Sequence, residues 1–391
     1  MSLKQISLNP DLVRLREEGY EVEVRGGYLI IHHIPYVNAE KQIQYGALVC
    51  PLNLNVDKTL PPKDHIMHFI GQHPHNADGT IITAIHHGSN DQKFAEGLIV
   101  NHSFSNRPLN GYPDFYEKAA TYASIISAQA KAIDKTVTEK TYRVIAEIEE
   151  ETVFQYPDTN ATRSNIGIIN NKLKGQKIAI IGLGGTGAYI LDLLAKTPVT
   201  EIHLFDGDRF LQHNAFRSPG AATIQELNGT PFKADYYRDK YIAIHKNIIA
   251  HPYPVGDTNV DKLKDMSHVF LSIDQNSSRR QLMAALLKMQ IPFIDTGIGV
   301  EAVDDFLIGS VRVTTATPQK ADHLADRVPV TDHEDDAYKS NIQIADLNML
   351  NAFMAVHKWK KMAGFYQDLI GEHHSIYSIN SSHLDSTVFK P

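Results

Sequence analysis

Cysteine is nearly absent from this chain of 391 residues, which has a single one, Cys50, beside 20 histidines. One thiol excludes an internal disulfide, and it excludes a structural zinc site built from four cysteines. Cys50 lies in the apolar run 47–52, where a free cysteine is usually a small buried hydrophobe rather than a nucleophile. We therefore expect Cys50 to be buried and to take no part in the chemistry.

Long apolar runs and an excess of positive charge are also missing. No apolar run approaches the roughly 20 residues of a membrane-spanning helix, and residues 1–12 lack the basic segment and apolar core of a signal peptide. With 38 Lys and Arg against 45 Asp and Glu, the net charge of −7 offers no electrostatic surface for nucleic acid. These absences predict a cytoplasmic protein with no nucleic-acid and no membrane partner.

The length of the chain predicts two domains, because 391 residues exceed the size of one ordinary domain. An acidic run at 147–152 precedes a stretch rich in polar and turn residues at 156–164. Such stretches are typical of loops and linkers, so we place the boundary there. The predicted domains are residues 1–155 and residues 156–391.

The first domain has the pattern of an α+β fold. Residues 20–37, around the pair Gly26-Gly27, predict a β-hairpin, and residues 44–52 predict a strand that pairs with it. Apolar residues at helical spacing predict an amphipathic helix over residues 112–134. Many of the histidines lie between positions 32 and 102, where two interpretations remain: several converge on a metal ion, or they line polar loops.

A glycine-rich segment organises the second domain. Residues 178–181 form a continuous apolar run, typical of a strand buried on both faces, and four glycines follow: Gly182, Gly184, Gly185 and Gly187. A helix predicted to begin near Thr186 would point free N–H groups at a phosphate. Asp206 ends a second predicted strand, residues 201–205, at a distance from the glycines that suits a ribose-binding carboxylate.

Taken alone, the glycines predict a nucleotide-binding site, and the usual interpretation of such a pattern is an NAD-dependent enzyme. The residues that follow change this interpretation, because they form the pattern D-x-D-x-φ-x-x-x-N-x-x-R, with φ apolar. They are Asp206, Asp208, Phe210, Asn214 and Arg217. A dehydrogenase never breaks the pyrophosphate linkage of its cofactor, whereas an enzyme that breaks the α–β bond of ATP needs cations for the developing charge. The pattern resembles the E1-like adenylyltransferase superfamily, which includes ThiF, MoeB and ubiquitin-activating enzymes, over about residues 163–366.

This resemblance implies a Rossmann-like α/β domain with a mixed sheet, and it implies a set of site residues. Further matches are Gly229 before Lys233-Ala234, and the segment 274–279 after a predicted strand at 268–273, where Gln275 replaces the usual Asn. The glycine loop with Thr186 would hold the phosphates of ATP, and Asp206 with Asp208 the nucleoside. Asn214, Arg217 and Lys233 would act on the reacting phosphates, Asp274 would bind Mg²⁺, and Arg163 would reach across a homodimer to the partner's ATP.

The last part of the chain predicts strands at 291–299 and 306–314, a crossover loop at about 315–340 and a closing helix at 345–364 with Met349, Phe353 and Val356 on one face. In thioester-forming relatives the nucleophilic cysteine lies in the crossover, but here that loop has none. It offers only hydroxyls, those of Thr314, Thr315, Thr317, Thr331 and Ser340. The resemblance places the closing helix at a dimer interface.

The resemblance therefore implies adenylation, with ATP and Mg²⁺, of the C-terminal carboxylate of a ubiquitin-like protein that ends in glycine. A bacterial ubiquitination-like pathway would fit, with the N-terminal domain recruiting the substrate or partner. The acyl group would pass directly, or through an oxyester, to an E2-like carrier. Two alternatives remain: a peptide or sulfur-carrier protein as substrate, or a different class, an NAD(P) oxidoreductase or nucleotide-binding scaffold.

Overall fold

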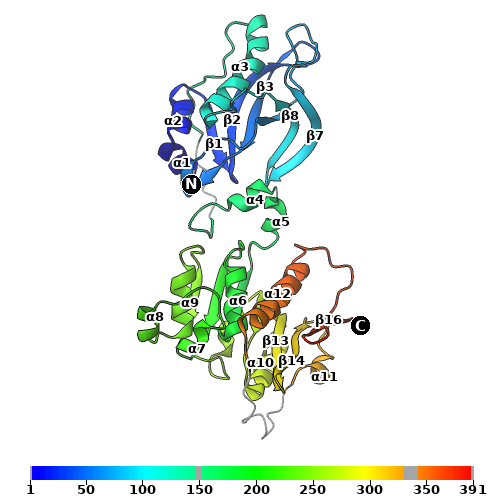
Figure 1. The fold of residues 1–391 in the computed structure, drawn as a ribbon. Coiled ribbons are helices and arrows are strands. Elements are labelled where there is room, and N and C mark those ends of the chain that lie inside the picture. Colours follow the sequence, from blue (N-terminus) through cyan, green and yellow to red (C-terminus); the bar gives the residue numbers. More distant parts are fainter. Residues whose placement is uncertain (1, 146–151, 165, 330–341, 389–391) are drawn as a thin grey trace. The chain divides into compact units, whose positions relative to one another are not determined.

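The computed structural model describes residues 2–145, 152–164, 166–329 and 342–388, except the side chains of residues 2–4, 162 and 163. The chain divides into two compact units (Figure 1). The N-terminal unit comprises Met1–Thr152 and Tyr156–Asn170, and the C-terminal unit comprises Val153–Gln155 and Asn171–Pro391. Within the described part of the chain, no helix is both long and apolar enough to cross a bilayer.

The N-terminal unit is built on a six-stranded sheet in the order β1-β2-β3-β6-β8-β7, in which every neighbouring pair is antiparallel. The predicted hairpin and its third strand are confirmed. The strands of this unit are β1 (Glu21–Arg25), β2 (Tyr28–Val37), β3 (Ile43–Pro51), β4 (Leu54–Asn55), β5 (Lys58–Thr59), β6 (Ile66–Ile70), β7 (His86–Ala95) and β8 (Leu98–Ser105). Its helices are α1 (Ser2–Leu8), α2 (Pro10–Glu17), α3 (Phe115–Ile133) and α4 (Thr159–Arg163), and α5 (Gly167–Asn171) follows at the division between the units.

Helix α3 covers this sheet and buries Phe115, Tyr122 and Ile126. It begins at Phe115 rather than at the predicted residue 112, because Asp114 takes the N-cap position and accepts the Glu117 N–H at 2.8 Å. Cys50 is 1% exposed, and burial raises the pKa of its thiol to about 11. The prediction that Cys50 is buried is confirmed.

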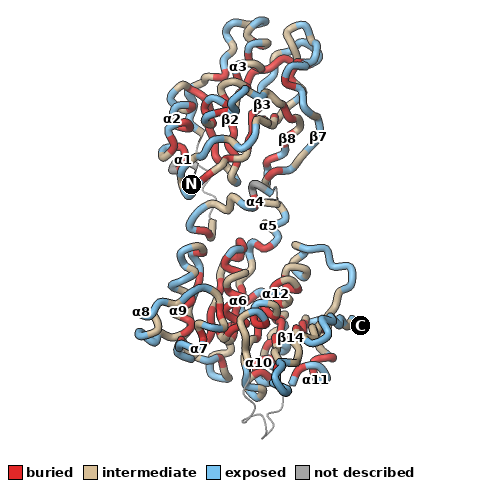
Figure 2. The backbone as a smooth tube through the Cα atoms, in the orientation of Figure 1, coloured by how far each residue is buried: buried red, intermediate tan, exposed pale blue. Residues whose placement is uncertain are grey.

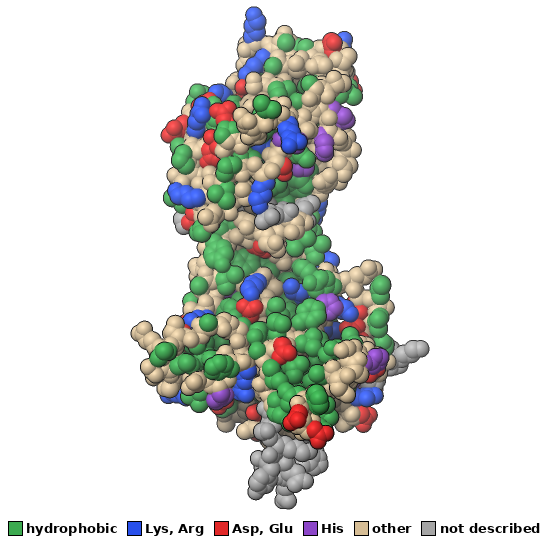
Figure 3. Space-filling view, viewed as in Figure 1, with side chains coloured by type: hydrophobic (Ala, Val, Ile, Leu, Met, Phe, Trp, Pro, Cys, Tyr) green, Lys and Arg blue, Asp and Glu red, His purple; other side chains and the backbone are tan. Residues whose placement is uncertain are grey.

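The histidines of this unit gather where β7 and β8 lie (Figure 3). His73 is central: its Nε2 lies 3.0 Å from Nδ1 of His86, and its ring centroid lies 5.0 Å from that of His102 and 5.4 Å from that of His75. Nevertheless, among the described residues no three His, Cys, Asp or Glu side chains have a geometry that could hold a metal ion. Of these four residues, His86 and His102 lie on β7 and β8, and only His73 and His75 lie in the segment between β6 and β7.

The C-terminal unit has a mixed eight-stranded sheet in the order β11-β10-β9-β12-β13-β14-β15-β16. The first five strands in this order pair in parallel and the remaining pairs are antiparallel, which confirms the mixed α/β sheet. The strands are β9 (Lys177–Ile181), β10 (Glu201–Phe205), β11 (Ile248–His251), β12 (His268–Leu271), β13 (Phe293–Val303), β14 (Phe306–Ala316), β15 (His374–Ser378) and β16 (His383–Thr387). Central strands such as β9 and β12 are buried on both faces, as continuous apolar runs predict (Figure 2).

Helices flank this sheet: α6 (Gly185–Leu194), α7 (Gln212–Ala215), α8 (Ile224–Asn228), α9 (Lys233–Tyr241), α10 (Asn276–Lys288), α11 (Leu324–Arg327), α12 (Ala345–Met362) and the 3₁₀ helix η1 (Val260–Leu263). Helix α12 packs on α6 and on β13 and β14. Its buried face is centred on Ala352, Ala355 and Trp359. Of the apolar face predicted from the sequence, Val356 is buried, whereas Met349 and Phe353 are 52% and 53% exposed.

Candidate nucleotide-binding site

One large cleft, of about 1530 Å³, lies at the carboxyl ends of β9, β10 and β12 and along β13. Parallel strands present their carboxyl ends at one edge of a sheet, where ligands bind in such folds. Nine of the predicted site residues line it: Gly182, Gly184, Gly185, Thr186, Asp206, Asp208, Arg217, Lys233 and Asp274. Gly187 and Asn214 do not line the cleft but lie in the segments that form it.

The glycine loop requires glycine for two different reasons. Gly182 has a φ of +89°, and a Cβ there would lie 2.3 Å from the carbonyl oxygen of Ser272. A Cβ at Gly187 would lie 1.9 Å from the Gly182 carbonyl oxygen, and one at Gly185 2.0 Å from Nδ2 of Asn348. Gly184, in contrast, has open space around it at the N-cap of α6, with no side chain capping the helix. The loop is therefore packed on its inner side and open toward the cleft.

Asp206 joins this loop to the next one. Its Oδ2 accepts the Leu183 N–H at 2.6 Å, and its Oδ1 accepts the Asp208 N–H at 2.8 Å. Burial raises the pKa of this carboxyl, and the nearby Lys233 ammonium opposes the rise. Each carboxylate oxygen retains a second lone pair that could accept a hydrogen bond from a ribose hydroxyl.

Lys233 is the first residue of α9, and its ammonium is held at the edge of the cleft by two carboxylates. Nζ lies 2.7 Å from Oδ2 of Asp208 and 3.8 Å from Oδ2 of Asp206. The Lys233 side chain is 9% exposed, while that of Asp208 is 75% exposed. The ammonium is thereby fixed toward the cleft, and a phosphate would compete with Asp208 for it.

Asn214 and Arg217 carry buried donors that have no hydrogen-bond partner among the described residues: Nδ2 of Asn214 and Nε of Arg217. Other polar groups of these two residues are hydrogen-bonded. Oδ1 of Asn214 accepts the Leu211 N–H at 2.9 Å, and the Arg217 carbonyl accepts a hydrogen bond from Nδ2 of Asn348 at 3.1 Å. Oδ1 of Asn348 in turn accepts from the Thr186 hydroxyl at 3.0 Å. Arg217 lines the cleft, so an anion bound there could partner its guanidinium, whereas Asn214 lies behind the cleft lining.

Asp274 follows the end of β12, is exposed and lines the cleft. The described residues offer no ready-made cage of three His, Cys, Asp or Glu ligands. Magnesium does not require one, since it is usually bound by one or two carboxylates together with substrate phosphates and water. A single exposed carboxylate at the mouth of a phosphate site therefore fits a Mg²⁺–nucleotide complex.

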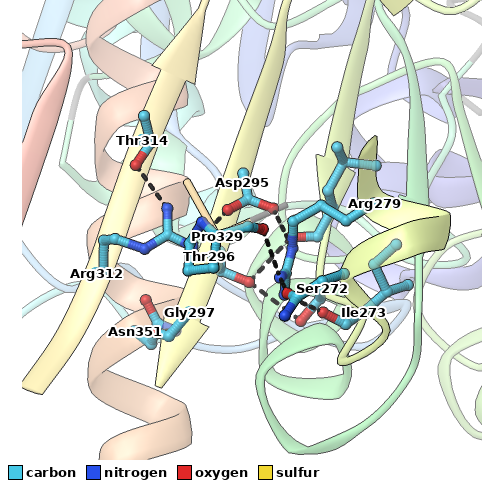
Figure 4. Close-up of polar contacts among 12 residues, drawn as sticks. Ser272, Ile273, Arg279, Asp295, Thr296, Gly297, Arg312, Thr314, Pro329 and Asn351 are labelled. Atoms are coloured by element: carbon cyan, nitrogen blue, oxygen red, sulfur yellow. Dashed lines mark hydrogen bonds and ion pairs between the residues drawn. The ribbon is translucent and has the colours of Figure 1, made fainter. Parts of the chain in front are cut away.

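Sequence reasoning missed Asp295, which is fully buried on β13 behind two residues that line the cleft, Arg279 and Arg312 (Figure 4). Its Oδ1 lies 3.1 Å from Nε of Arg279 and its Oδ2 2.6 Å from Nη2 of Arg312. Arg312 Nη1 donates to the Thr314 hydroxyl at 2.7 Å, and that hydroxyl lies 2.9 Å from Nδ1 of His374. The sequence feature that could have identified Asp295 is a single acidic residue within an apolar strand, because a buried carboxylate is usually paired or functional.

Two sets of predicted residues cannot be placed in the cleft. Arg163 ends α4 in the N-terminal unit, and its side chain lies outside the described residues. Thr331 and Ser340 of the crossover also lie outside them. Thr314 and Thr315 are fully buried, at 0% and 2% exposure, which leaves the half-buried Thr317 as the accessible hydroxyl among the described crossover candidates.

Comparison with known proteins supports the same fold. A ThiF family model matches residues 160–329, and a model described as a domain of unknown function (DUF6791) matches residues 10–159. No curated protein matches the chain.

Three of the solved structures that match part of this chain are the following. Escherichia coli MccB with ATP is 17% identical over 57% of this chain and 66% of its own, with a TM-score of 0.46. E. coli MccB with AMPCPP and MccA is 18% identical over 57% of this chain and 66% of its own, with a TM-score of 0.46. PaaA is 14% identical over 73% of this chain and 91% of its own, at 0.46. The chain thus spans just under two thirds of the length of the MccB chains solved with ATP and with AMPCPP and MccA.

The ThiF match covers the segment that contains the glycine loop, the Asp206–Arg217 pattern, Lys233 and Asp274. The mixed sheet and the cleft at its carboxyl edge agree with that match. Residues 160–329 are a ThiF family domain, and with them the chain carries the E1-like adenylyltransferase fold.

Proposed function

We propose that the C-terminal unit uses ATP and Mg²⁺ to adenylate the C-terminal carboxylate of a protein or peptide. The observation that carries this proposal is that one cleft is lined by the glycine loop, by Lys233 and by Arg217, whose Nε has no partner among the described residues. These groups suit a polyphosphate. MccB, whose fold is similar, was solved with ATP and with MccA, which agrees with this proposal.

The reaction joins a carboxylate oxygen of the substrate to the α-phosphorus of ATP, and pyrophosphate leaves with the electrons of the α–β bond. Arg217 and Lys233 would stabilise the charge that develops on the leaving phosphates, and Asn214 would donate to a phosphate oxygen. The N-terminus of α6 and the open Gly184 would hold the polyphosphate in line. Bound through Asp274, Mg²⁺ would supply further neutralisation of the phosphates.

For the substrate, we propose a ubiquitin-like protein ending in glycine, in a bacterial ubiquitination-like pathway. The separate N-terminal unit, with its own core, is suited to recruiting a folded substrate or an E2-like carrier.

We also propose a homodimer. The exposed apolar side chains on α12, those of Met349 and Phe353 with the nearby Tyr366, are consistent with an interface there.

We propose direct transfer of the acyl group to the carrier. Cys50 is buried with a raised pKa, and Thr314 and Thr315 are buried too, so none of these is placed to attack an adenylate. An oxyester route would have to use Thr317 or a crossover hydroxyl outside the described residues.

ATP–pyrophosphate exchange tests the proposal, with ubiquitin-like proteins encoded beside the gene as substrates and a short peptide and a sulfur-carrier protein as comparisons. We expect exchange that depends on Mg²⁺ and on a free C-terminal carboxylate. Asp274→Ala should abolish it without changing the unfolding temperature, because that side chain is exposed and contributes nothing to the core. Full activity of Asp274→Ala, or binding of NAD but not ATP, would refute the assignment.

A further inference from the structure

A chain of four polar side chains runs along one face of β10 and β11. Nε2 of His203 lies 3.0 Å from Oε2 of Glu201, and Nδ1 of His203 lies 3.0 Å from Nε2 of His251. Nδ1 of His251 in turn lies 2.8 Å from the hydroxyl oxygen of Tyr253. None of these four described residues lines the cleft. The chain therefore connects the first residue of β10 to the segment that follows β11, behind the cleft wall.

Glu201 gives this chain of hydrogen bonds a direction. The hydrogen bond from His203, together with Lys177, holds the pKa of Glu201 below its usual range, so Glu201 is a carboxylate that only accepts. While both imidazoles are neutral, His203 must donate from Nε2 to Glu201, and its Nδ1 must accept from Nε2 of His251. Nδ1 of His251 then accepts from the Tyr253 hydroxyl. One carboxylate thus fixes the tautomers of two rings and the orientation of a hydroxyl.

The ring of His251 supports a residue of the cleft wall. Burial, with smaller contributions from His203 and Lys262, lowers the pKa of His251 to about 4, so this ring is uncharged near neutral pH. It stacks on the ring of Phe205, with centroids 4.1 Å apart and planes 7° apart. Phe205 itself lines the cleft. The hydrogen bonds that hold the His251 ring therefore also hold Phe205 in place.

The main chain near His251 joins the two loops that border this end of the cleft. The His251 carbonyl accepts the Asp206 N–H at 3.2 Å and the Tyr253 N–H at 2.8 Å. Pro254 directly follows Tyr253 and lines the cleft. It lies so close to Gly207 that a Cβ on this glycine would be 2.8 Å from Cδ of the proline. A shift of the segment after β11 would therefore displace the loop that carries Asp206.

We propose that Glu201, His203, His251 and Tyr253 form a relay of positioning residues that sets the affinity of the cleft for ATP. The carboxylate at its far end lies five residues before Asp206, which is roughly 16 Å of strand. The relay acts on binding rather than on the chemical step, because it touches none of the groups proposed to act on the reacting phosphates. This inference rests on the proposed adenylation and adds residues that position the site without contacting the nucleotide.

The test is a double-mutant cycle on the affinity of the full chain for ATP with Mg²⁺, measured by calorimetry. Tyr253→Phe removes only the hydroxyl at one end of the relay, and Glu201→Ala removes the acceptor at the other end. Each should weaken ATP binding by about three- to tenfold, which corresponds to one hydrogen bond. Because both changes break the same relay, the double variant should bind ATP about as well as the weaker single variant, whereas independent effects would multiply.

Two variants at the same edge of the sheet serve as controls. Glu201→Gln keeps a carbonyl oxygen that accepts the His203 N–H, so its affinity for ATP should stay within about twofold of the wild type. Lys177→Met removes the 3.0 Å ion pair with Glu201 but leaves the relay intact, and it should also bind ATP like the wild type. Thermal unfolding of each variant checks that the fold is retained.

Two further measurements distinguish a positioning relay from a purely structural contact. In ATP–pyrophosphate exchange, Tyr253→Phe should raise KM for ATP while kcat changes by less than about twofold. In ¹⁵N spectra of the histidine-labelled protein at pH 8, His203 and His251 should both carry their proton on Nε2, with the signals assigned from variants that lack each ring.

The outcomes separate this inference from the proposed function. If the wild-type chain binds no ATP, adenylation is refuted and the inference with it. If ATP binds but either single substitution leaves the affinity within about twofold, or if the two effects multiply in full, the relay is refuted and adenylation stands. A fall in kcat without a rise in KM, a Glu201→Gln or Lys177→Met protein as weak as Glu201→Ala, or a proton on Nδ1 of either ring at pH 8 would also overturn the relay.

Discussion

Replacing Arg217 by alanine should separate catalysis from stability. The main-chain contacts of Arg217 do not depend on its side chain: its N–H donates to the Asn214 carbonyl at 3.1 Å, and its carbonyl accepts from Asn348. In its side chain, Nε is buried without a partner among the described residues. The substitution therefore removes an unsatisfied donor, and we expect the free energy of unfolding to change by no more than about 0.5 kcal/mol.

The substitution should instead lower the rate of the adenylation reaction. Loss of one preorganised donor to developing charge typically costs about 2 to 4 kcal/mol of transition-state stabilisation, which is roughly a thirty- to thousandfold loss of rate. The measurement is ATP–pyrophosphate exchange, with thermal unfolding of the same preparation as the check on folding. Arg209→Ala is a matched control, because Arg209 lies in the same loop, is exposed, does not line the cleft and donates to the Thr230 carbonyl.

Two results would refute this reasoning. An Arg217→Ala protein that retains exchange within about threefold of the wild type would show that the guanidinium does not meet the reacting phosphates. A protein that loses activity together with several kcal/mol of stability would show that Arg217 has a structural role that its contacts do not reveal.

Three further predictions follow from other residues. If Arg163 acts across a dimer, mixing Arg163→Ala and Asp274→Ala proteins should restore part of the exchange activity, and no recovery despite proven subunit exchange would count against a shared site. No thioester should form on Cys50, and a thiol-cleavable adduct by mass spectrometry that Cys50→Ser abolishes together with product would contradict this. Burial lowers the pKa of His73 from 6.5 to about 4, so its contribution to stability should be lost as pH falls through that window. His73→Asn should make the unfolding midpoint less dependent on pH there, and an unchanged pH dependence would show that His73 protonates freely in the folded protein.

Local sequence patterns predicted much of the C-terminal unit because its parallel strands are buried on both faces. The apolar runs at β9 and β10 and the glycines between them identify the first βα unit without further information. The buried face of the closing helix was harder to predict, because the apolar periodicity selected Met349 and Phe353, which are half exposed. The buried face of α12 instead carries Asn348 and Asn351, whose amides bond to the glycine loop and to β13. Polar residues that are buried by specific pairing look like surface residues in a sequence.

Asp295 shows why part of a site cannot be read from a sequence. Its two cationic partners come from α10 and β14, and the distances in sequence to Arg279 and Arg312 follow no recurring spacing. Only the antiparallel register of β13 and β14 brings Arg312 beside Gly297 and Thr314 opposite Asp295. The Asp206–Arg217 pattern, in contrast, is local, because one loop supplies those residues. Groups supplied by one loop can thus be recognised from a local pattern, whereas the ion pairs of Asp295 depend on strand pairing and become visible only in the folded chain.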